Sequence, residues 1–202
     1  MTTIADQRSL LRSELKDTDA LNYRWTDADL DQAIQNALAD YSLLLPKGAT
    51  EVLPAVAGEY AYTPTTPRLV AVTAVECPAD LHPPAFVSFT FDGANVRIFP
   101  HSPPRDGDSL RLWLACYHSI DASSSTVPAH HEALLRLGAQ SYALAAWAAH
   151  AVNRINVSPW TVKHFQTLAE QKLRQFRRAL ERLRDQDAQR AESTVVIAGY
   201  EI

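Results

Sequence analysis

The stretch Trp25-Thr26-Asp27-Ala28-Asp29-Leu30 marks the start of a helix. The Thr26 side chain can cap the backbone N–H of Asp29, and the Asp29 carboxylate is favourable at a helix N-terminus. Trp25, one residue before the cap, can pack back onto Leu30 as a hydrophobic staple. Apolar residues then recur at helical spacing as far as Pro46 and Gly48, which end the helix: Leu30, Ala33, Ile34, Ala37, Leu38 and Tyr41.

Helical periodicity also occurs on either side of this helix. A first helix is predicted where Ile4, Leu11 and Leu15 follow Thr3, and residues 16–22 form a polar turn. A third begins at Pro128, which suits a first helical position, and its stripe of alanines permits close packing of helices. The last begins at the Ser158 cap and runs to about Arg190.

Residues 49–126 differ in composition, because they contain nine of the twelve prolines. Short β-prone runs alternate there with turn signals, as in an antiparallel sheet. Asp92-Gly93 supplies the positive φ angles of a tight hairpin turn. We expect strands near Val52 and in the ranges 59–62, 69–76, 85–90, 95–99 and 110–117.

The predicted fold class is therefore α+β. A four-helix bundle, built from residues 1–48 and 127–190, carries an antiparallel β-domain of residues 49–126 inserted between helices two and three. Residues 191–202 are expected to form an extended C-terminal tail.

The tail contains the uncharged, β-prone run Thr194–Ile197, which is an improbable solvent-exposed segment. Docking on a partner chain would satisfy it, and the alternative is a last strand of the chain's own sheet. The predicted partner-binding residues are Arg184, Arg190, Val195, Val196, Ile197, Tyr200 and Ile202.

The sequence predicts no catalytic residues, no metal site and no bound cofactor. P-loop, dinucleotide-binding and G-x-S-x-G motifs are absent, and the serines at 123–125 beside Asp121 and His118 are better explained as a polar loop. Cys77 and Cys116 are expected to be buried strand thiols, and no apolar run is long enough for a membrane span.

Two alternatives remain open. Seven histidines invite a small metal-dependent enzyme, although H-E-x-x-H spacing is absent around the His130-His131-Glu132 run. The basic stretch 161–192 would suit a DNA-binding module, although acidic residues interleave it and no aromatic stacking platform accompanies it. Against a net charge of −4, this stretch is the basic part of the chain.

The chain resembles the head-to-tail connector (adaptor) proteins of tailed bacteriophages. The resemblance rests on residues 22–30 (N-Y-R-W-T-D-A-D-L) with Pro46 after them, on the strand at 69–78, and on short motifs at 127–128 and 137–144.

This resemblance implies a structural protein of the virion neck, assembled in the bacterial host cytoplasm and without catalytic residues. It implies a homo-oligomeric ring, of about twelve copies, that docks under the portal protein and extends the channel. Double-stranded DNA would pass through without sequence recognition. A stopper or tail protein would bind downstream, and the C-terminal helix and tail would contact the portal.

Overall fold

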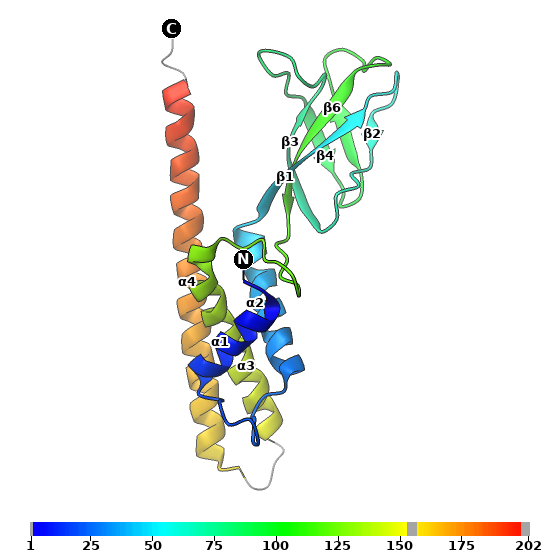
Figure 1. Ribbon diagram of the computed structural model, residues 1–202. Coiled ribbons are helices and arrows are strands. Elements are labelled where there is room, and N and C mark those ends of the chain that lie inside the picture. Colours follow the sequence, from blue (N-terminus) through cyan, green and yellow to red (C-terminus); the bar gives the residue numbers. More distant parts are fainter. Residues whose placement is uncertain (1, 153–156, 199–202) are drawn as a thin grey trace. The chain divides into compact units, whose positions relative to one another are not determined.

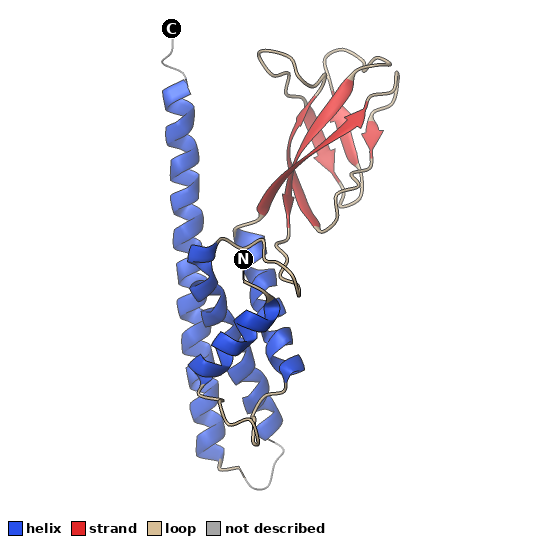
Figure 2. Cartoon of the chain, viewed as in Figure 1, coloured by secondary structure: helices blue, strands red, loops and turns tan. Residues whose placement is uncertain are grey.

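The computed structural model describes the backbone of residues 2–152 and 157–198 and the side chains as far as residue 189 (Figures 1 and 2). The chain forms two compact units. One is helical and joins Met1–Leu45 to His118–Ile202, and the other is the β-unit Pro46–Tyr117. The predicted fold class, α+β with the β-part inserted between helices two and three, is confirmed.

The described part of the helical unit contains α1 (Ile4–Leu15), α2 (Asp27–Leu44), a short 3₁₀ turn η1 (Ala129–His131), α3 (Glu132–Ala151) and α4 (Pro159–Ala198). Thr3 and Thr26 begin α1 and α2 with capping boxes, in which the threonine oxygen accepts from the backbone of the third helical residue and that residue's carboxylate accepts in return. Both helix starts therefore agree with the sequence-based prediction.

Apolar faces of all four helices share one core. Leu11, Leu30, Leu135 and Leu180, one from each helix, are completely buried. A close approach occurs at Gly138 of α3, where an added Cβ would lie 2.8 Å from the ring of Phe176 and 3.0 Å from Cβ of Ala37. Glycine at this position therefore lets α2, α3 and α4 meet.

Two features differ from the sequence prediction. The third helix begins at Glu132, because the residues after Pro128 first form the turn η1. The chain after residue 190 is helical as far as Ala198 rather than extended. Each residue added to a formed helix gains one backbone hydrogen bond, and a β-branched residue costs only about 0.5 kcal/mol in helix propensity. A valine-rich run can therefore continue a long helix.

The segment 118–126 also differs in placement, because it joins the helical unit while its sequence suggested the β-domain. The backbone N–H of His118 donates to Ser42 Oγ at 3.0 Å. Ile120 and Val127 are buried in the helical core. Side-chain burial, which turn composition does not encode, sets this boundary.

The β-unit contains two three-stranded antiparallel sheets, ordered β1-β6-β3 and β2-β5-β4. The strands are β1 (Lys47–Pro54), β2 (Ala61–Tyr62), β3 (Leu69–Glu76), β4 (Ser88–Phe91), β5 (Val96–Phe99) and β6 (Ser109–Cys116). Asp92 closes the predicted β4–β5 hairpin, since its carboxylate accepts from the backbone N–H groups of Ala94 and Asn95.

The two sheets enclose a core of their own, which includes Val75, Val96, Ile98, Leu110 and Leu112. Cys77 and Cys116 are buried free thiols here, and burial raises the pKa of both. Among the described helices of the chain, none combines the length and the apolar character that crossing a bilayer requires.

Glu51 of β1 holds the segment that follows β2. Its carboxylate accepts the backbone N–H and the hydroxyl of Thr65, at 2.8 and 2.6 Å, and those of Thr66, at 3.0 and 2.6 Å. Burial alone would raise the pKa of Glu51, but the four hydrogen bonds outweigh it and lower the pKa from 4.5 to about 2.

We predict that Gly138→Ala destabilises the protein by about 1–3 kcal/mol, although alanine has the higher helix propensity. The buried Phe176 ring cannot move into solvent to make room for the added methyl group. Urea denaturation would measure the free energy of unfolding. The double variant Gly138→Ala with Phe176→Leu should regain part of the free energy of unfolding that Gly138→Ala loses. If Gly138→Ala alone stabilises the protein, the close packing at this position is refuted.

A second prediction concerns the stability of the protein at acidic pH. Because the folded state lowers the pKa of Glu51, its contribution to stability is complete above pH 4.5 and is lost as the pH falls towards about 2. The free energy of unfolding of the wild type should therefore fall towards that of Glu51→Gln across this window. Urea titrations at stepwise pH would test it, and a constant difference between the two proteins would contradict it.

Candidate assembly surfaces

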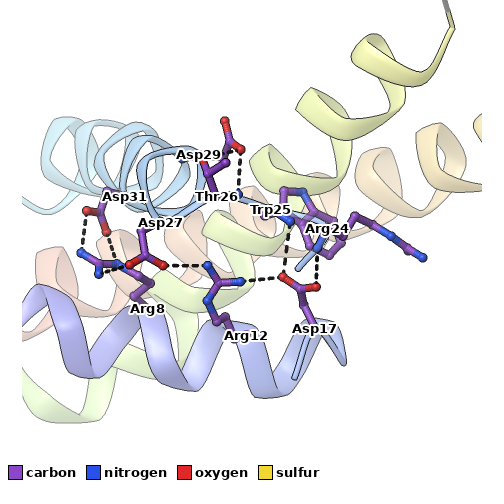
Figure 3. A network of polar contacts seen from close by, with 9 residues as sticks. All are labelled: Arg8, Arg12, Asp17, Arg24, Trp25, Thr26, Asp27, Asp29 and Asp31. Atoms are coloured by element: carbon purple, nitrogen blue, oxygen red, sulfur yellow. Dashed lines mark hydrogen bonds and ion pairs between the residues drawn. The ribbon is translucent and has the colours of Figure 1, made fainter. Parts of the chain in front are cut away.

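The loop between α1 and α2 is organised around the buried carboxylate of Asp17 (Figure 3). This carboxylate accepts from the guanidinium of Arg12 at 2.7 Å and from the backbone N–H of Arg24 at 2.7 Å. A longer contact of 3.4 Å joins it to the backbone N–H of Trp25. One charge thus fixes the end of α1 and the residues that lead into α2.

Trp25 anchors the start of α2 to another helix. Trp25 is 3% exposed, and its Nε1 donates to the backbone carbonyl of Ala143 on α3 at 2.9 Å. The capping box follows at once, and the hydrogen bonds from Thr26 lower the pKa of Asp29. The start of α2 is therefore fixed twice, by the contact of Trp25 with α3 in the core and by the solvent-exposed capping box of Thr26 and Asp29.

Ion pairs align α1 along α2 (Figure 3). Arg12 reaches Asp27 at 2.7 Å, and Arg8 bridges Asp27 at 2.9 Å and Asp31 at 2.7 Å. Arg8 donates to both oxygens of Asp31, the two-point geometry that guanidinium groups favour. The hydrogen bond from Arg12 lowers the pKa of Asp27, and the pair with Asp31 raises the pKa of Arg8.

Sequence reasoning missed this network, although a signal was present. Arg8 and Arg12 are four residues apart on the first helix, and Asp27 and Asp31 are four apart on the second. Such spacing places each pair on one helix face, so two antiparallel helices can match them.

The predicted partner-binding residues lie at the far end of α4. Residues 184–189 are exposed, and Arg184 pairs there with its neighbour Asp185 at 3.0 Å. Arg190, Val195, Val196 and Ile197 lie on the helical backbone beyond the described side chains, and Tyr200 and Ile202 lie outside the described residues. Their role in binding stays a prediction.

Two of the seven histidines, His131 and His118, are held in contacts inside the helical unit. Tyr41 Oη lies 2.7 Å from Nδ1 of His131, and burial, the larger cause, lowers the pKa of His131. His118 is buried, with Nδ1 2.9 Å from the carbonyl of Thr126 and Nε2 3.1 Å from that of Leu45. Among the described residues no group of three or more His, Cys, Asp and Glu side chains has a metal-binding arrangement.

The serine loop forms a local turn. Asp121 Oδ1 accepts from the backbone N–H and hydroxyl of Ser123, both at 2.7 Å, and from the backbone N–H of Ser124 at 2.8 Å. The Asp121 carboxylate therefore caps its own loop, an arrangement typical of Asx turns.

Some basic residues of α4 are paired with acidic residues of the same helix. Arg174 lies 3.7 Å from Glu170 one turn earlier, and Arg184 lies 3.0 Å from Asp185. Such mixed charge is typical of a solvated helix face and weakens binding to phosphates.

The solved structures that match this chain include three chains from gene transfer agent (GTA) particles. A chain from the neck of a native GTA particle, computed with C12 symmetry, aligns with 85% of this chain and 92% of its own at 15% identity and a TM-score of 0.31. A chain from the neck of an empty GTA particle with C6 symmetry covers 85% and 88%, at 17% identity and a TM-score of 0.30.

A chain from the virion of a native gene transfer agent particle covers 84% of this chain and 88% of its own, at 18% identity and a TM-score of 0.30. TM-scores of about 0.3 are too low to establish a common fold. The chain matches no protein-family model and, at a significant level, no curated protein.

The Asp17 network gives a testable prediction. Arg12→Met should destabilise the protein by about 3 kcal/mol, because the Asp17 carboxylate, 5% exposed, then keeps only backbone donors. Arg12→Met with Asp17→Asn should cost less than Arg12→Met alone, since no charge is left buried. Thermal and urea unfolding would measure both, and a loss below about 1 kcal/mol for Arg12→Met would show that the pair is dispensable.

Proposed function

We propose that this chain is a structural head-to-tail adaptor of a tailed phage or phage-like particle. Copies would form a ring beneath the portal protein that extends the DNA channel and docks tail components. The protein would act by binding rather than by catalysis, and it would reside at the neck of the virion.

The observation that carries this proposal is the far end of α4. The helix is 40 residues long, and Leu183 is its last described residue with a partly buried side chain. Every described side chain from Arg184 to Gln189 is exposed, and the helical backbone continues to Ala198. We call residues 184–198 the helical arm.

A helical arm of this composition favours a partner. The arm continues a formed helix, but most helical stability comes from packing against other elements, and the described side chains of the arm, as far as Gln189, are exposed. The arm ends in the apolar run Val195–Val196–Ile197, which would be covered by the groove of another protein in the helix-in-groove mode. Arg184 and Arg190 would pair with acidic groups on that partner, which affects association rate more than affinity.

The resemblance to phage adaptors supplies the kind of partner. Its central motif, residues 22–30, includes the anchored helix start at Trp25 and Thr26, so the motif has a physical role in this chain. The resemblance implies that the C-terminal helix contacts the portal, which makes the portal the proposed partner of the helical arm.

The channel role requires that DNA pass without being held. A dense lining of lysine and arginine would bind phosphates, release counterions and retain the duplex. The α4 residues Arg174 and Arg184 instead have acidic neighbours, Glu170 and Asp185. This alternation of basic and acidic residues favours a channel that lets DNA pass and disfavours a module that binds DNA.

The test replaces the apolar end of the arm. Val195→Ser, Val196→Ser and Ile197→Ser together should leave thermal unfolding unchanged while abolishing binding to the purified portal protein of the same particle. Ser193→Ala with Thr194→Ala, in the same turn, is the matched control and should bind normally. If the triple serine variant binds the portal as the wild type does, the arm is not the contact.

A further inference from the structure

One end of the helical unit exposes large apolar side chains. The α1–α2 loop contributes Leu21, 91% exposed, and Tyr23, 47% exposed. Val152, just after α3, is 60% exposed, and Trp160 in the first turn of α4 is 75% exposed. We call these residues, with Arg24 and His164, the aromatic end.

The aromatic end is continuous through ring contacts. The Arg24 guanidinium lies over the rings of Trp147 and Phe165, 5.2 and 5.3 Å from their centroids. His164, next along α4, is 6.3 Å from Phe165, and Trp160 stacks on His164 at 5.6 Å with an interplanar angle of 10°. A path of aromatic rings thus runs from the α1–α2 loop to the start of α4.

Arg24 differs from the arginines of the neighbouring network. Arg8 and Arg12 each contact carboxylates, whereas no ion pair joins Arg24 to a carboxylate in the described part of the chain. Its side chain is exposed and extends away from Asp17 in Figure 3. The guanidinium therefore offers its hydrogen-bond donors to a carboxylate from outside.

The position of Arg24 is set in advance. Its backbone N–H donates to the buried Asp17 carboxylate, and the next residue, Trp25, is anchored on α3. A side chain held over aromatic rings loses less freedom on binding than one on a mobile loop, which favours affinity. Tryptophan, tyrosine and arginine are also the residues that dominate binding energy in protein interfaces.

We infer that the aromatic end is a docking surface for a second protein, one that presents a carboxylate to Arg24 beside an apolar hollow for Trp160. A duplex DNA partner fits less well, because the aliphatic Leu21 and Val152 gain nothing from phosphates. Among the described residues of this end the cations are Arg24 and Lys163, which are few for phosphate binding.

This inference rests on the proposed function and extends it to the second partner. About 36 Å of helix, at 1.5 Å per residue, separate Trp160 from Arg184, where the helical arm begins. The two surfaces are therefore distinct. If the helical arm holds the portal, the aromatic end is available for the downstream stopper or tail protein.

Photo-crosslinking on assembled particles tests this. Leu21, the most exposed of the group, would be replaced by p-benzoylphenylalanine, with the same replacement at Gln32 on the exposed face of α2 as the control. After irradiation, position 21 should yield peptides of a neck or tail protein other than the portal, with acidic residues near the cross-link. Cross-links to the portal, to another copy of this chain or to DNA, or none at all, would overturn the inference.

Substitutions separate the two surfaces. Arg24→Glu and Trp160→Ser, each on an exposed side chain, should lower the yield of tailed particles about tenfold or more while binding of the purified portal stays normal. Gln32→Glu, which introduces the same acidic residue on the exposed face of α2, is the control and should change neither. Normal tail joining in both variants would overturn the inference and leave the proposed function standing, whereas particles that lack this chain altogether would refute both.

Discussion

The buried ion pair between Asp17 and Arg12 is the interaction on which the rest of the helical unit depends. A carboxylate that is 5% exposed is stable as a charge only when donors surround it, and Asp17 has the Arg12 guanidinium and the backbone N–H groups of Arg24 and Trp25. Those donors belong to the end of α1 and to the residues that lead into α2. The same contacts that satisfy one charge thus set where Trp25 enters the core and where Arg24 is displayed.

Much of the fold could be predicted from local chemistry. The threonine caps at Thr3 and Thr26, the Asp92 turn and the period of the apolar residues are encoded within a few positions, and the helices and strands lie near their expected ranges. What the sequence did not reveal depends on tertiary contacts. The Asp17 network joins residues from two helices, and the placement of Ile120 in the helical core depends on burial.

The binding surfaces, too, could be predicted only where local sequence determines them. The β-prone run at 194–197 predicts an extended tail, yet the helical backbone of α4 continues to Ala198, because a helix that is already formed propagates readily. The aromatic end was not predicted as a surface, because its rings come from the α1–α2 loop, α3 and α4 and meet only in the folded chain. Exposed apolar side chains such as Leu21 and Trp160 become informative once their exposure is known.

The central claim, that this chain is a neck adaptor, is tested most directly by an electron cryo-microscopy density map of the head–tail junction of the particle that encodes it. The account predicts a closed ring of copies of this chain beneath the portal, with residues 184–198 against portal density and the aromatic end against a different protein. A junction without this chain, or copies found only away from the neck, would contradict it.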